Sequence, residues 1–208
     1  LIFTPVDKKN LKTILKTYRH IFWERCCAEI AEADQPEKYG VYNYIQFWLV
    51  YSGKRVVGMT GLSSYPQYPK DAFMEWYGVL PEERGKGYGE KIFKWTVHQA
   101  KKLGFKTFRL YTEKGDNDAA IAMYRKMNMR EEPYTNEKGI ENMVMFSLSL
   151  TNKRVSLWKN KYIGIWQSDM MYANNLRKLV KSNLYATGMT FLKHPKTIYY
   201  LLKNKLFK

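Results

Sequence analysis

A short glycine-rich stretch near the middle of the chain has the composition of an anion-binding loop. It directly precedes a segment with the periodicity of a helix. Glycines leave backbone amides uncovered, and the first amides of a helix have no partner within it and lie at the positive end of its dipole. Two cationic side chains add to this charge. We therefore expect a pyrophosphate to bind at Arg84, Gly85, Lys86, Gly87, Tyr88 and Gly89.

The spacing of the glycines argues against two common nucleotide motifs. The G-x-x-x-x-G-K-S/T pattern of a triphosphate-binding loop is absent. Glycines at 85, 87 and 89 do not form G-x-G-x-x-G, and no first strand with an acidic residue about 20 positions further on accompanies them. On the loop alone, a plain tight turn between a strand and a helix is the alternative interpretation.

The loop resembles the pyrophosphate loop of the GNAT acetyltransferases, whose pattern R/Q-x-x-G-x-G/A begins here at Arg84. The preceding run Val79–Glu83 is similar to the V-x-P-E approach of that family, and residues 117–127 resemble its N-x-x-A-x-x-x-Y helix. The resemblance covers roughly residues 1–150, including the order of elements. It departs at residues 128–129, where this chain has Asn-Met and the family often has Gly-Phe.

This resemblance implies acetyl transfer from acetyl-CoA to an amine, with no metal. It implies that the backbone amides of Val79 and Leu80 hold the pantetheine and the thioester carbonyl oxygen. It also implies that Asn117 contacts the pantetheine or pyrophosphate region, and that Tyr124 protonates the leaving thiolate. A tyrosine on an amphipathic helix is otherwise usually a core-packing residue with its hydroxyl at the edge.

Glu75 is the predicted general base. Strict alternation along a strand at residues 73–80 places Glu75, Tyr77 and Val79 on one face, and many family members have an acidic residue at a similar place. A carboxylate there would take the proton of the amine directly or through water. A surface or salt-bridged glutamate is the alternative, and Tyr77 and His98 are weaker candidates.

Hydrophobic periodicity and turn residues predict the elements that position these groups. Strands are expected near residues 1–6, 44–51, 55–64, 73–80, 105–112, 130–135 and 142–150, and helices at 8–22, 24–33, 88–103 and from 116 or 117 to 129. With the resemblance, this order predicts an α/β fold: a GNAT-like mixed, mostly antiparallel sheet of about seven strands flanked by helices. Residues 1–150 would form the acetyltransferase domain.

Residues 151–208 are expected to form a basic, amphipathic helical extension, with helices at 168–184 and from 194 onward. They contain twelve Lys/Arg and one acidic residue, and so carry +11 of the formal net charge of +16. Such a segment favours anionic partners. We rank three hypotheses for this segment. The first is that it helps to form a homodimer or a lid over the acceptor, the second that it contacts an anionic membrane peripherally, and the third that it binds nucleic acid. A solvated surface is the plain alternative.

Together these features predict an N-acetyltransferase that moves an acetyl group from acetyl-CoA to a primary amine, of a small molecule or peptide, by direct attack in a ternary complex. The alternatives are an acyl-CoA-binding pseudo-enzyme or regulator, and a membrane-surface acyltransferase acting on an amino sugar or lipid-linked amine. Adjacent Cys26 and Cys27 provide no disulfide framework or metal motif. Residues 1–5 lack the features of a signal peptide, so we expect a cytoplasmic protein.

Overall fold

The computed structural model describes residues 1–22, 42–115, 117–134 and 143–158, and in the last part of the chain residues 177, 180–181, 184–193, 195–196, 198–199 and 202. Their elements are β1 (Ile2–Pro5), α1 (Leu11–Phe22), β2 (Tyr44–Ser52), β3 (Arg55–Ser64), β4 (Asp71–Val79), the 3-10 turn η1 (Pro81–Glu83), α4 (Tyr88–Lys102), β5 (Thr107–Glu113), α5 (Asp118–Lys126), β6 (Arg130–Pro133), β7 (Met143–Ser149) and α8 (Leu184–Lys193).

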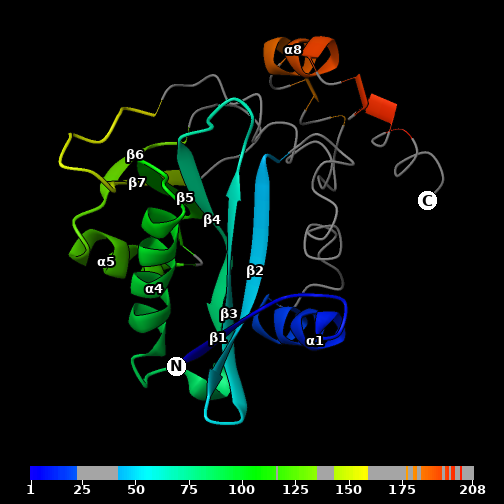
Figure 1. The fold of residues 1–208 in the computed structure, drawn as a ribbon. Helices are drawn as coiled ribbons and strands as arrows, with labels where there is room; N and C mark the ends of the chain where they lie inside the picture. The colour runs from blue at the N-terminus through cyan, green and yellow to red at the C-terminus, as the bar shows by residue number, and fades with distance from the viewer. Residues whose placement is uncertain are drawn as a thin grey trace.

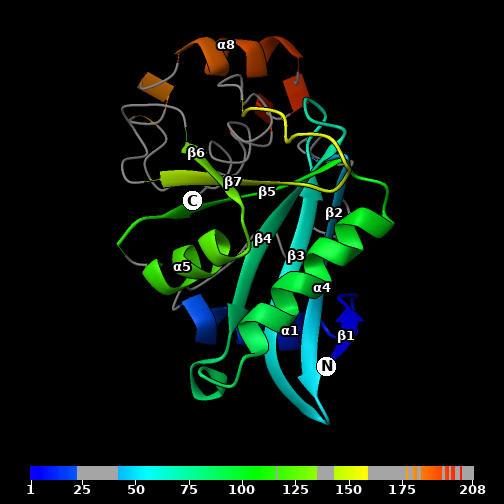
Figure 2. The same cartoon turned by 90° about the vertical axis from the view of Figure 1, so that its left-hand side faces the viewer.

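The seven strands form one sheet in the order β1-β2-β3-β4-β5-β7-β6. All neighbouring pairs are antiparallel except β4 and β5, which run parallel. Helix α1 covers one face of the sheet, while α4 and α5 cover the other (Figures 1 and 2). The predicted fold class, a mostly antiparallel sheet of about seven strands flanked by helices, is confirmed.

Strand β2 shows why the central strands are almost continuously apolar. Ile45, Phe47 and Leu49 pack in the core beneath α1, whereas Trp48 packs in the core beneath α4 and α5. Because both faces of the sheet are covered, both sets of alternating residues must be apolar. A tight turn at residues 53–54 then returns the chain into β3, as the sequence predicts.

A β-bulge in β4 interrupts the alternation on which the sequence prediction relied. Between the pairs Gly61↔Glu75 and Met59↔Gly78, one residue of β3 is opposed by two residues of β4. Trp76 is the inserted residue, and its φ is +38°. An extra residue shifts every later side chain to the other face of the strand.

The prediction that Glu75, Tyr77 and Val79 share one face is therefore wrong. Glu75 and Trp76 both face α1, as their contacts with Tyr65 and with the core beneath α1 show. Tyr77 and Val79 face α4, where both pack beside Ile92. The strict period of two holds only for a strand without a bulge, and nothing in the local composition of residues 73–80 marks this one.

Helix α5 ends in a way that explains the departure from the family pattern. The amide of Asn128 donates to the carbonyl of Arg125 and that of Met129 to the carbonyl of Tyr124, as in a Schellman motif. Asn128 has a φ of +55°, a conformation that asparagine tolerates better than most residues. Met129 is buried in the core beneath α4 and α5, so Asn-Met fills the roles of a Gly and an apolar residue.

Residues that follow β7 pack into the same domain. The buried guanidinium of Arg109, on β5, lies 2.7 Å from Asp71 Oδ2 and donates to the Ser156 carbonyl and hydroxyl oxygens. The same guanidinium lies against the ring of Trp158, whose backbone amide donates to Glu132 Oε1. Residues 156–158 are thus tied to three strands of the sheet by a buried polar network, so the predicted extension begins inside the domain's packing.

Several predicted elements fall outside the described residues. These are the helix at 24–33, the cap residue Asp116 and most of the helix at 168–184. Helix α8 occupies residues that the sequence prediction left between two helices, because Gly188 and two threonines lower the intrinsic helix propensity there. Within the described parts of the chain, no helix is long and apolar enough to cross a membrane.

Candidate active site

The glycine loop connects η1 to the start of α4, and its backbone is open. Gly85 and Gly87 have φ angles of +77° and +74°, which residues with a side chain rarely adopt. No atom lies within 4 Å of the point where a Cβ would stand at either position. Among the described residues, none accepts a hydrogen bond from the amides of residues 85–90. The loop therefore presents consecutive N–H groups at the positive end of α4, as a pyrophosphate site requires.

The two predicted cations of the loop are held close to it. Lys86 Nζ lies 2.8 Å from Glu83 Oε2, and Arg55 Nη1 lies 3.3 Å from Glu83 Oε1. The hydrogen bond from Lys86, followed by the charge of Arg55, keeps the pKa of Glu83 below its ordinary value. Arg84 Nε donates to the carbonyl of Val79 at 3.3 Å. Both cations thus stay beside the loop while the amides face outward.

The first turn of α4 packs closely against its neighbours. A Cβ added at Gly89 would lie 2.9 Å from the Tyr77 hydroxyl oxygen, so a side chain there would push α4 away from β4. The Tyr88 hydroxyl lies 3.1 Å from Ser52 Oγ in the β2–β3 hairpin. At positions 88 and 89 it is therefore the backbone, rather than the side chain, that faces a ligand.

Strands β4 and β5 separate soon after they start. They pair only from Asp71↔Thr107 to Phe73↔Arg109, although β4 continues to Val79 and β5 to Glu113. In the antiparallel register with β3, the Leu80 amide donates to the Val57 carbonyl. The amide of Val79, one residue earlier, therefore points away from β3 toward the diverging β5. Of the two amides predicted to hold acetyl-CoA, that of Leu80 is already paired within the sheet.

Tyr124 lies on α5 on the far side of this divergence. Its side chain is buried, and its ring packs between Phe93 at 5.6 Å and Phe146 at 5.3 Å. Burial raises the pKa of the Tyr124 phenol far above its ordinary value, and the Tyr77 phenol raises it further. The hydroxyl is consequently protonated at neutral pH and can act as a proton donor. Asn117 is exposed at the N-cap of α5, where its side chain makes no capping hydrogen bond.

The two weaker sequence candidates lie in different surroundings. The Tyr77 side chain is half-buried on the α4 side, with its hydroxyl 3.9 Å from Met123 Sδ, and burial raises the pKa of this phenol above the ordinary value. Tyr77 and Tyr124 are thus neighbouring phenols next to the start of α4. His98 is exposed midway along α4, one helical layer away from the strands that carry the other candidates.

Glu75 is buried on the α1 side of the sheet, with 5% of its surface exposed. Ser63 Oγ donates to Glu75 Oε1 at 2.6 Å, and the Tyr65 hydroxyl donates to the same oxygen at 3.2 Å. The alternative of a surface glutamate is therefore wrong. Sequence reasoning missed Ser63 and Tyr65, because only the β3–β4 register brings the end of β3 beside Glu75.

Residues 10–129, more than half of the chain, match the family described as Acetyltransferase (GNAT) family. The chain belongs to the GNAT acetyltransferase family. Among curated proteins, none matches the sequence.

Solved structures of acetyltransferases share the fold of this GNAT protein at low sequence identity. The ribosomal-protein-S18-alanine N-acetyltransferase from Escherichia coli has a TM-score of 0.58 and 15% identity, over 76% of this chain and 99% of that chain. YncA from Salmonella typhimurium, solved with acetyl-CoA, has a TM-score of 0.55 and 16% identity, over 73% and 95%. Spermidine N-acetyltransferase from Vibrio cholerae, solved with CoA and spermine, has 0.55 and 14%, over 72% and 95%.

Family membership makes this protein an acyl-CoA-dependent N-acetyltransferase, with acetyl-CoA as its acyl donor. The residues present fit that donor, because the amides of residues 85–90 are free at the positive end of α4 and the Val79 amide points into the β4–β5 divergence. Within the described part of the chain, no group of three or more His, Cys, Asp or Glu side chains is placed to hold a metal ion.

The loop geometry predicts that Gly87→Ala weakens acetyl-CoA binding. A Cβ disfavours a φ of +74° and would turn the loop amides away from the pyrophosphate. Gly104→Ala is the matched control, because Gly104 has a φ of +87°, also borders open space and lies just beyond the opposite end of α4. We expect both variants to lose about 1 kcal/mol of stability, but only Gly87→Ala to bind CoA at least about tenfold more weakly by calorimetry. Equal CoA affinities would contradict the assignment.

Proposed function

We propose that this protein transfers the acetyl group of acetyl-CoA to a primary amine by direct attack within a ternary complex, with Glu75 as the base and Tyr124 as the acid. The bound donor supplies an activated acyl group as a thioester. The observation that carries the proposal is that a buried carboxylate and a buried phenol flank the β4–β5 divergence from opposite faces of the sheet. Nitrogen attacks the carbonyl carbon, the carbon–sulfur bond breaks, and two protons move.

Glu75 is suited to take the proton from the amine. Ser63 and Tyr65 both donate to Oε1 of its carboxylate, and such donors favour the ionised form against the opposing effect of burial. Glu75 precedes the bulge at Trp76 and stays on the α1 face, whereas the bulge places the phenol of Tyr77 on the α4 face with Tyr124. The acceptor would therefore enter from the α1 side of the sheet.

Tyr124 is suited to give a proton to the leaving thiolate. Its phenol stays protonated because burial opposes ionisation, and a thiolate is a far better base in a buried site than in water. The Val79 amide, which points into the same divergence, would hold the thioester carbonyl oxygen and stabilise the charge that develops on it. We assign this contact to Val79 alone, because the amide of Leu80 is already paired.

The α1 side of the site is rich in aromatic rings. Tyr65 packs against Tyr42 and Phe73, and Tyr111 lies 5.1 Å from Tyr134 in the same core. Aromatic faces beside a carboxylate suit a cationic amine. The similar solved structures include enzymes named for a protein's alanine and for spermidine, so N-terminal peptides and polyamines are the first acceptors to test.

Tyr124→Phe is expected to lower kcat by about 10- to 1000-fold, the usual contribution of a positioned acid, and to leave the Kd of CoA unchanged. Tyr44→Phe is the control, because Tyr44 is a half-buried phenol, with a pKa raised to about 12, that packs on Phe105 away from the divergence. Release of CoA thiol is measured over N-terminal peptides, polyamines, amino sugars and aminoglycosides. Equal kcat values for the two variants would remove Tyr124 from the mechanism.

Ser63→Ala is expected to move the acidic limb of the kcat/KM profile to higher pH, because the ionised Glu75 carboxylate loses its 2.6 Å donor. At alkaline pH the variant should approach the wild-type rate. Ser64→Ala is the control, since Ser64 is equally buried but its hydroxyl donates to the Tyr68 carbonyl. An unshifted limb in Ser63→Ala, or the same shift in both variants, would count against Glu75 as the base.

A further inference from the structure

Helix α8 carries its apolar side chains on the outside. Leu184, Tyr185 and Leu192 expose 70%, 62% and 79% of their surfaces, and Phe191 is exposed as well. Leu184, Gly188, Phe191 and Leu192 follow the i, i+4, i+7, i+8 spacing of one helical stripe, and Tyr185 lies beside it. Beyond α8, Tyr199 and Leu202 are exposed as well. Isolated exposed leucines are ordinary, but an aligned row of them on one helix indicates a partner.

The inward-facing side of α8 carries polar side chains. Thr187 and Thr190 are buried, with 5% and 0% of their surfaces exposed. A helix that only caps its own domain places leucines inward and polar residues outward. In α8 this polarity is reversed, so the helix exposes apolar surface that the described part of the chain does not cover.

Positive charge surrounds the stripe. Lys181, Lys193 and Lys196 are exposed at both ends of α8. Residues 170–208 contain eight Lys/Arg and no Asp or Glu. A second copy of this chain would bring the same positive charge against itself, which opposes association. Nucleic acid would match the charge but offers no apolar surface to a row of leucines.

We propose that α8 attaches the protein to the surface of an anionic lipid bilayer. The apolar stripe would lie in the boundary between headgroups and acyl chains, while the lysines contact lipid phosphates. Long lysine side chains reach from such a helix to the headgroup level.

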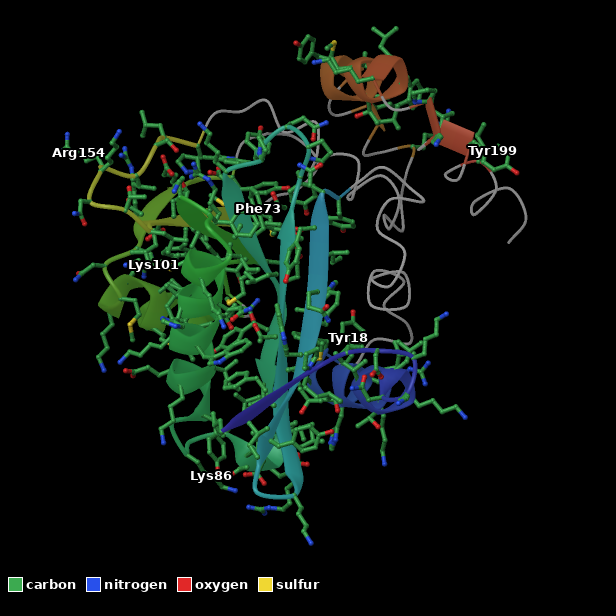
Figure 3. All side chains as sticks on the ribbon, viewed as in Figure 1. Tyr18, Phe73, Lys86, Lys101, Arg154 and Tyr199 are labelled. Atoms are coloured by element: carbon green, nitrogen blue, oxygen red, sulfur yellow. The ribbon has the colours of Figure 1, made fainter. Side chains whose placement is uncertain are left out.

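The position of α8 is compatible with activity at a surface. In both ribbon views α8 lies at one end of the molecule, and η1 and the start of α4 lie at the other (Figures 1 and 2). Figure 3 shows Lys86 of the glycine loop at the end opposite to Tyr199, and side chains of α8 projecting beyond the rest of the molecule. A chain bound through α8 would keep its acetyl-CoA loop in solution.

The test is co-sedimentation of the full chain with phosphatidylcholine vesicles, with and without phosphatidylglycerol. We expect binding to the anionic vesicles only. Leu184→Ser/Leu192→Ser should weaken it by at least about tenfold, because binding scales with buried apolar area. Lys181→Gln/Lys193→Gln/Lys196→Gln should weaken it by about a hundredfold, since each lysine near such a surface contributes roughly fivefold. Added salt should reduce wild-type binding.

Matched controls change the same residue types elsewhere on the surface. Ile2→Ser/Leu103→Ser removes two exposed apolar side chains, and Lys101→Gln/Lys102→Gln/Lys106→Gln removes three exposed lysines. Both should bind like wild type. The proposal is overturned if anionic vesicles are not bound, or if the α8 variants bind as well as their controls. It is also overturned if α8 mediates dimerisation or RNA binding and the chain does not bind vesicles.

Discussion

The site depends on one constraint, namely that β4 pairs with β5 for only three residues and then continues alone beside β3. This arrangement leaves the Val79 amide unpaired by the sheet, at the place where we propose that the acyl group is held. The bulge at Trp76 lies within the same stretch and turns Tyr77 and Val79 toward α4, whereas Glu75, which precedes it, faces α1. A sheet that stayed fully paired would satisfy every amide but would have no opening for a substrate.

The glycine loop and the fold could be predicted from the sequence because their signals are local. Glycine spacing, apolar periodicity and turn residues each depend on a few neighbouring positions, and they place β3, α4 and the loop within one or two residues of their observed bounds. The faces of β4 could not be predicted this way. A bulge depends on how two strands pair across the sheet, and no residue between 73 and 80 reveals that pairing.

The partners of Glu75 illustrate the same limit. Ser63 and Tyr65 lie ten or more residues away from it, and they meet its carboxylate only through the β3–β4 register. Asn128 shows the reverse case. Its side chain departs from the family pattern, yet its backbone takes the left-handed conformation that the glycine of the pattern favours. The motif is therefore preserved in backbone geometry rather than in sequence. In α8, inward threonines and outward leucines likewise became visible only once the helix was placed on the domain.

The central claim is that unpaired backbone amides, rather than side chains, hold the donor. Residue-resolved amide hydrogen exchange of the full chain, with and without acetyl-CoA, tests it most directly. We expect the amides of Val79 and residues 85–90 to become protected when acetyl-CoA is bound, while the Leu80 amide, already bonded to Val57, keeps its rate. Unchanged exchange at Val79 and the loop under saturating acetyl-CoA would contradict the account.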